Sequence, residues 1–106
     1  MITDIAKNEG LDGILIDTIK LHSADPGPDG LANLIAGTET AIVLDAAVGG
    51  VRSMAAPLDI SVPAGAVSHY TLFSGTVLKS SDAFAVAETY AAPGTAKITT
   101  ATLTAT

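Results

Sequence analysis

The sequence predicts a mainly β protein: a single-domain β-sandwich, or a small barrel, preceded by a short helical segment. Turn-forming residues recur roughly every 8–12 residues over the last two thirds of the chain, a spacing typical of sandwiches and barrels. Residues Leu58–Val62 alternate apolar and polar side chains, which is the period of a half-buried strand. The chain has 106 residues, and at about 150 residues per domain this length leaves room for one domain. We therefore expect one domain over residues 1–106, with a helical lead-in over 1–18 and strands over 19–106.

The first 18 residues carry a weak helix signal. Thr3 can cap a helix, and Asp4 then lies in the first turn, where the helix dipole favours negative charge. Gly10 and Gly13 weaken the helix, by about 1 kcal/mol each relative to alanine. One or two short helices are therefore expected here.

The remainder of the chain predicts short strands separated by turns. The first strand ends at the Ser23–Gly30 loop, whose two prolines fix the backbone and remove hydrogen-bond donors. Residues 31–35 are expected to form a single helical turn that ends at Gly37, and residues 80–82 are expected to separate two strands. The expected strands cover residues 19–22, 40–44, 51–54, 58–62, 67–73, 77–79, 84–90 and 97–106.

The last expected strand is rich in threonine. Its even positions from Thr100 to Thr106 are all threonine, while Ala101, Leu103 and Ala105 give the other face an apolar character. Two interpretations stay open. The segment is either an edge strand whose polar face meets water, or a strand that pairs with another subunit.

Charge and composition exclude several classes of protein. The net charge is −6 and the five basic residues are scattered singly, so the chain lacks the basic cluster that binds a phosphate backbone. The apolar runs are far shorter than the roughly 20 residues of a membrane span, and we expect no signal peptide. The absence of cysteine excludes disulfides and thiolate chemistry.

The surface is unusually poor in charge. Charged residues make up 15% of the chain, against about 25% in a typical globular domain. Aromatic residues make up 4% and tryptophan is absent, so the core must be built from small aliphatic side chains. We expect a marginally stable monomer that neighbouring copies complete.

The loop at residues 25–30 has a superficial likeness to a calcium-binding loop. Asp25, Asp29 and Gly30 stand at its first, fifth and sixth positions. Gly27 at the third position offers no side-chain oxygen, and Ala36 stands at the twelfth, where a bidentate glutamate is needed. We interpret the loop as a structural turn.

Two histidines and two serines are the next candidates for chemistry. His22 and His69 lie in no metal-ligating spacing, so we interpret them as histidines that bond the backbone or lie at the rim of the sheet. Ser23 or Ser68 could join a histidine and an acid in a triad, but only geometry makes a triad and no G-x-S-x-G motif is present.

Two pairs of acids could act as general acid and base. They are Asp45 with Asp59, and Asp82 with Glu88. Their spacing favours no chemistry. We therefore predict no catalytic, cofactor-binding or metal-ligating residue, no cofactor and no enzymatic activity.

The four aromatic residues are expected in the core: Tyr70, Phe73, Phe84 and Tyr90. Sugar-binding sites need aromatic faces, and only Tyr70 and Tyr90 are candidates here. A tyrosine ring exposed in a groove would favour sugar binding, and burial of both rings would disfavour it.

Several short motifs occur in a fixed order along the chain. They are Ile19–Gly27, the Gly30 and Asn33 pair, the Gly49–Gly50 turn, Val62–Gly65, Ser68–Ser74 and the threonine-rich end. From about residue 11 onward they resemble small structural proteins of tailed phages, described as minor tail or tail-fibre proteins, with a Leu-His-Thr-Ala-Asp-Pro-Gly motif after a strand. That family commonly has an aromatic-Ala-Arg motif and a tryptophan in the middle, where this chain has only Thr40–Leu44 and Val51–Arg52.

The resemblance implies a non-enzymatic bacteriophage virion structural protein, a minor tail or tail-fibre component that acts through protein–protein assembly contacts. The alternative is a capsid decoration protein that stabilises the phage head, and a receptor- or carbohydrate-binding module is a further alternative. The resemblance also implies that the protein is located in the virion, which is assembled in the host cytoplasm, and that its partners are other virion proteins. We expect a homo-oligomer, with a trimer favoured, and no nucleic acid or membrane partner. The Ser23–Gly30 loop and the C-terminal strand are the expected contact elements.

Overall fold

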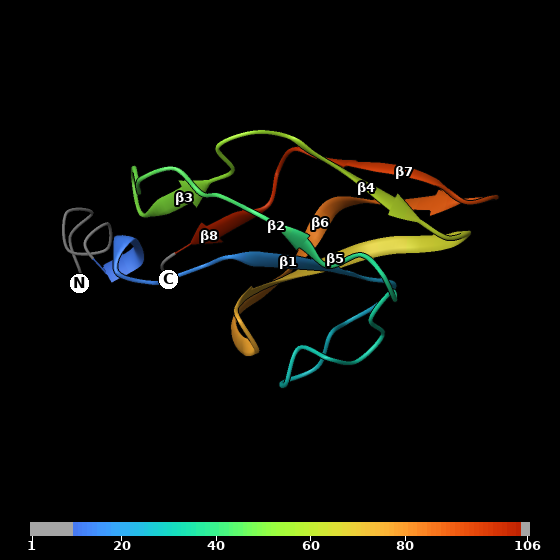
Figure 1. Cartoon of the computed structure of the whole chain (residues 1–106), viewed down its shortest axis with the longest axis horizontal. Coiled ribbons are helices and arrows are strands. Elements are labelled where there is room, and N and C mark those ends of the chain that lie inside the picture. The colour runs from blue at the N-terminus through green and yellow to red at the C-terminus, as the bar shows by residue number, and fades with distance from the viewer. Residues whose placement is uncertain (1–9, 105–106) are drawn as a thin grey trace.

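The computed structural model describes residues 10–104 and has a mainly β fold (Figure 1). This confirms the predicted β-sandwich. The strands are β1 (Thr18–His22), β2 (Thr40–Ala41), β3 (Val51–Ser53), β4 (Leu58–Val62), β5 (Gly65–Ser74), β6 (Val77–Tyr90), β7 (Gly94–Ile98) and β8 (Thr102–Thr104). Within the described residues, no helix is long and apolar enough to cross a membrane.

Two layers of antiparallel strands make the sandwich. One layer is a four-stranded sheet in the order β2-β1-β5-β6, and the pairs β3-β8 and β4-β7 form the other layer, above it in Figure 1. Register places Ile19 opposite Leu72 and Leu21 opposite Tyr70, so the apolar side chains of β1 and β5 share one face. These four are buried in a core cluster with residues of the second layer: Ile60, Val62, Ala96, Ile98, Ala101 and Leu103.

The other face of β1 and β5 is also buried. His22, Thr71 and Phe73 are at most 1% exposed, and the loop that follows β1 runs along this side, below the sheet in Figure 1. The main chain of this loop accepts a hydrogen bond from the His22 ring at Ala32. The middle of the sheet is therefore covered on both faces, which explains why β5 is apolar at successive positions rather than strictly alternating.

In the described part of the predicted helical lead-in, the helix ends at residue 12. Within the described part of residues 1–18, only residues 10–12 are helical, and residues 1–9 lie outside the described residues. After residue 12 the backbone extends toward β1, and the Asp17 N–H donates to the carbonyl of Phe73 on β5. The segment thus joins β5 at Asp17 instead of continuing as a helix.

The predicted helical turn at residues 31–35 is wrong. Leu34 forms an isolated bridge with His22, and Asn33 takes a φ of 55°. The Ser23 N–H donates to the Asn33 carbonyl, and the Ile35 N–H donates to the Leu21 carbonyl. The segment therefore bonds to the end of β1 instead of to itself.

The predicted break at residues 80–82 is also wrong, because β6 runs unbroken from Val77 to Tyr90. Ser80, Ser81 and Asp82 pair with Leu72, Thr71 and Tyr70. The ten-residue β5 offers them a ladder, and their polar side chains are tolerated because β6 is an edge strand. By contrast, the predicted strand at 97–106 is two strands.

The break between β7 and β8 follows from their partners. β7 pairs with β4, whereas β8 pairs with β3, so the chain must change direction between Ile98 and Thr102. The predicted strand at residues 40–44 is likewise shortened to Thr40–Ala41, and Leu44 makes only an isolated bridge with Met54.

Candidate functional site

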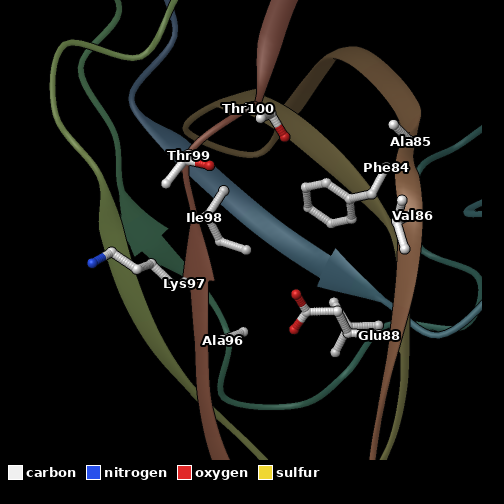
Figure 2. A pocket seen from close by; sticks show the side chains of 10 residues that line it. Phe84, Ala85, Val86, Glu88, Ala96, Lys97, Ile98, Thr99 and Thr100 are labelled. Atoms are coloured by element: carbon white, nitrogen blue, oxygen red, sulfur yellow. The ribbon is translucent and has the colours of Figure 1, made fainter.

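A cavity of about 210 Å³ lies between β6 and β7, at the open side of the sandwich (Figure 2). Aliphatic, aromatic and hydroxyl side chains form most of its wall. The lining residues are Val67, Phe84, Ala85, Val86, Glu88, Ala96, Lys97, Ile98, Thr99 and Thr100.

The cavity exists because β6 leaves its ladder with β5. Between the register pairs Val67–Glu88 and His69–Ala83, four residues of β6 (84–87) face the single β5 residue Ser68. A bulge of this size turns a strand away from its neighbour. The nearest strand of the other layer, β7, pairs with β4, so β6 and β7 face each other across the opening without a shared ladder.

The side chains of the wall are arranged by polarity. In Figure 2 the Phe84 ring and the Glu88 carboxylate point into the space between the strands, whereas the Lys97 ammonium points away. The Phe84 ring lies 4.9 Å from the Tyr70 ring, centroid to centroid, at an interplanar angle of 41°, and this contact fixes the back of the cavity. The site is therefore apolar with one inward acidic group.

Tyr90 holds the Glu88 side chain in place. Its hydroxyl donates to Glu88 Oε2 at 2.6 Å and also lies 3.4 Å from the Thr95 carbonyl oxygen. The hydrogen bond to the carboxylate raises the pKa of the Tyr90 hydroxyl above its usual value, because the bond and the negative charge both favour the protonated phenol.

The structure brings the two predicted histidines together, opposite each other on β1 and β5. His22 Nδ1 lies 2.9 Å from the Ala32 carbonyl oxygen, and Nε2 lies 2.9 Å from Thr71 Oγ1. Because a carbonyl only accepts, Nδ1 must carry the proton and Nε2 accepts from the Thr71 hydroxyl. Burial lowers the pKa of His22, and the charges of His69 and Lys20 lower it further, against the opposing effect of the Ala32 hydrogen bond.

His69 makes a different contact, with its sequence neighbour. His69 Nδ1 lies 2.8 Å from Ser68 Oγ. Among residues 10–104 no carboxylate is hydrogen-bonded to either histidine, and no group of three or more potential metal ligands is found there. The arrangement is a serine–histidine contact on one strand, without the acid that a triad needs.

The two acids of the calcium-like loop accept hydrogen bonds from backbone N–H groups of the loop itself. The Gly27 N–H donates to Asp25 Oδ1 at 2.9 Å, and the Leu31 N–H donates to Asp29 Oδ1 at 3.0 Å. The Asn33 side chain donates to the Asp25 carbonyl. These hydrogen bonds are those of a structural turn.

The four acids proposed as pairs have different neighbours. Asp59 stands opposite Lys97 in the β4–β7 register, and the Asp82 carboxylate accepts from the Ala83 N–H. Asp45 contributes main-chain groups, accepting from Arg52 through its carbonyl. Of the four, Glu88 alone lines the cavity.

The two tyrosines are both engaged in the fold. Tyr70 is 2% exposed, and its hydroxyl donates to the Thr102 carbonyl and accepts from the Thr102 N–H. Tyr90 is half-buried, with its ring against Gly94. Phe73 is buried and Phe84 half-buried against the core, as expected for aromatic residues of a small domain.

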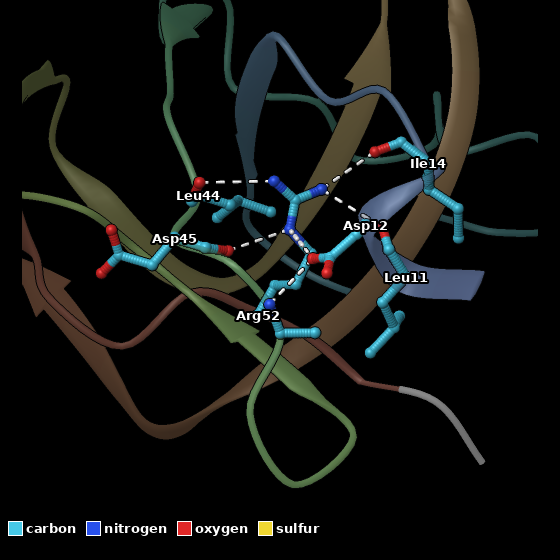
Figure 3. Close-up of polar contacts among 7 residues, drawn as sticks. Leu11, Asp12, Ile14, Leu44, Asp45 and Arg52 are labelled. Atoms are coloured by element: carbon cyan, nitrogen blue, oxygen red, sulfur yellow. Dashed lines mark hydrogen bonds and ion pairs between the residues drawn. The ribbon is translucent and has the colours of Figure 1, made fainter. Parts of the chain in front are cut away.

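Arg52 has a role that the sequence did not reveal. Its guanidinium donates to four main-chain carbonyls and lies 3.8 Å from Asp12 (Figure 3). The four acceptors are Leu11, Ile14, Leu44 and Asp45, at 3.0 to 3.3 Å. The one available signal is that Arg52 is the only arginine in the chain, in a strand flanked by small and apolar residues.

Comparisons with protein-family models, with curated proteins and with solved structures find no match for this chain.

Proposed function

We propose that the protein is a non-enzymatic structural component of a bacteriophage particle, a minor tail or tail-fibre protein that acts through contacts with other virion proteins. The observation that carries the proposal is the long uncovered edge strand β6. It is the last strand of the four-stranded sheet, and ten of its 14 residues are exposed. An edge of this kind is a template for pairing with another chain.

The composition of β6 supports pairing. Edge strands that must stay unpaired usually carry proline or charged side chains, especially lysine. β6 contains no proline, and its three charged residues, Lys79, Asp82 and Glu88, leave residues 83–87 uncharged. Val77 and Val86 are 56% and 77% exposed, so the edge also offers apolar surface to a partner.

The burial of Tyr70 counts against the sugar-binding alternative, whereas Tyr90 is only half-buried. Tyr70 is buried, with its hydroxyl bonded to Thr102, and Tyr90 rests on Gly94 with its hydroxyl on Glu88. Stacking of a sugar needs a free aromatic face.

The placement on a phage particle rests on the order of the sequence motifs, and it is tested on particles. Phage particles from the host that carries the gene are purified on a density gradient, analysed by mass spectrometry and labelled with antibodies against the chain. The chain is expected in the particle band at fixed stoichiometry, with label on the tail. Label on the head would replace the tail assignment with capsid decoration, and absence of the chain from particles would overturn the proposal.

A further inference from the structure

We propose that the cavity between β6 and β7 binds a lysine or arginine side chain carried on an extended segment of a partner protein. This inference rests on the proposed function, since it specifies the chemistry of the partner that the β6 edge receives.

The volume of the cavity suits one long side chain. It measures about 210 Å³, whereas pockets for small-molecule ligands span roughly 300–1,000 Å³. Its walls include Val67, Phe84, Ala96 and Ile98. Lysine and arginine bury their aliphatic stems along such surfaces while the charged end seeks a polar partner.

The charge of the cavity selects a cation. The Glu88 carboxylate points into it and the Lys97 ammonium points away (Figure 2). A carboxylate has about four acceptor positions, and the Tyr90 hydroxyl occupies one of them. The inward Glu88, together with the net charge of −6, makes the site complementary to a basic side chain.

The aromatic ring adds to this preference. The Phe84 ring points into the same space as the Glu88 carboxylate, and a cation over a ring face is stabilised by the ring quadrupole. The same molecule already shows this contact elsewhere, where Lys20 Nζ lies 4.2 Å from the centroid of the Phe73 ring.

The backbone of β6 can align the segment that carries the side chain. β6 is the last strand of its sheet, so its main-chain groups that point away from β5 have no ladder partner among the described strands. An extended segment that adds to a sheet edge bonds through its main chain and places alternate side chains in pockets. The cavity lies beside residues 84–86 of β6, where such an inward side chain would enter.

The test is an NMR titration of the full isotope-labelled chain with an acetylated and amidated Thr-Val-Lys-Val-Thr peptide. A matched peptide has norleucine, which lacks the ammonium group, in place of lysine. The lysine peptide is expected to shift the amide signals of Phe84, Val86, Ala96 and Ile98, and to bind about fivefold or more tightly than the norleucine peptide, as a charge-assisted hydrogen bond requires.

Two variants distinguish the effect of the Glu88 carboxylate from the effect of the overall negative charge of the protein. Glu88→Gln is expected to reduce affinity for the lysine peptide to that for the norleucine peptide. Glu39→Gln removes an exposed carboxylate outside the cavity and should leave the affinity unchanged. The amide spectrum of each variant reports that it is folded.

Three results would overturn the assignment: equal affinity for the two peptides, shifts confined to other residues, or no binding. Each is independent of the particle experiment. If the chain is found on the particle tail but does not bind the lysine peptide, the proposed function stands. Only the proposal that the cavity binds a basic side chain is then overturned.

Discussion

His22 joins three parts of the fold through one buried imidazole. It has no exposed surface, and its ring bonds the loop at Ala32 and β5 at Thr71. The positive groups that lower its pKa are Lys20 on its own strand and His69 on β5. Protonation would therefore place a buried charge beside two basic side chains, while the acids of the covering loop, Asp25 and Asp29, bond their own backbone.

The free energy of unfolding should fall as the pH is lowered from 8 to 5. Because the pKa of His22 is lower in the folded state, the unfolded chain binds more protons once the pH drops below about 6.5, and stability is lost from there downward. The pKa of Asp17 is lowered by hydrogen bonds from Thr18 and Gly75, so its contribution is lost only below about pH 4. Urea unfolding at several pH values measures the slope, and His22→Gln should flatten it. A slope that persists in the variant would assign it to other groups.

At the scale of elements, two sets of contacts hold irregular segments of the chain against the sandwich. Arg52 on β3 ties the segment around residues 11–14 to residues 44–45. On the other side of the sheet, Gly30 brings the Ser23–Gly30 loop against Leu78 on β6. Neither segment has a regular ladder, so its position depends on these contacts.

Arg52→Lys should lower the free energy of unfolding by about 2 kcal/mol, because a lysine keeps the charge but cannot serve four carbonyls arranged around a planar guanidinium. Asp12→Asn is the matched control. It removes the negative charge 3.8 Å from Arg52 but keeps the oxygen that accepts from the Ala47 N–H, and should cost less than about 0.5 kcal/mol. Urea unfolding measures both. Equal losses would mean that the Arg52–Asp12 ion pair, and not the hydrogen bonds from Arg52 to the four carbonyls, stabilises this part of the fold.

Gly30→Ala should destabilise the protein more than Gly37→Ala. Both glycines have a positive φ, 71° and 79°, which costs an alanine about 1–2 kcal/mol. A Cβ at residue 30 would also lie 2.7 Å from Leu78 Cδ1, whereas nothing lies within 4 Å of one at residue 37. Adding Leu78→Ala to Gly30→Ala should recover part of the difference in thermal unfolding. No recovery would mean that the loop does not rest on Leu78.

At the scale of the whole molecule, the buried residues are mostly aliphatic, with two aromatic rings, Tyr70 and Phe73. Large apolar side chains remain outside: Leu15, Leu31, Val43, Val48, Val77 and Val86 are between 54% and 77% exposed. Association of copies would bury part of this surface. It would also add the stability that a core of small side chains lacks.

If the chain is a trimer that unfolds to monomers, its melting temperature should fall by about 4 °C for each tenfold dilution, because mass action favours dissociated chains. Scanning fluorimetry over a hundredfold concentration range measures the shift, and light scattering coupled to size-exclusion chromatography gives the mass. A monomeric mass with a melting temperature independent of concentration would rule out the trimer and leave the proposed contacts with other proteins.

The sequence by itself determined the features that depend on neighbours along the chain. Alternation at Leu58–Val62 predicts β4 because side chains on a strand point to opposite faces. Proline, glycine and aspartate predict the turns of the Ser23–Gly30 loop, since they act on their own backbone. The mainly β class follows from the repetition of both signals.

Only the tertiary structure decided the features that depend on distant partners. Residues 80–82 continue β6 because β5 lies beside them, and β7 ends at Ile98 because β4 and β3 are separate partners. The pairing of His22 with His69, the carbonyls around Arg52 and the cavity beside Glu88 each join residues far apart in the chain. Strand pairing is chosen by burial over the whole fold, and no local pattern of residue types specifies which strand will lie alongside.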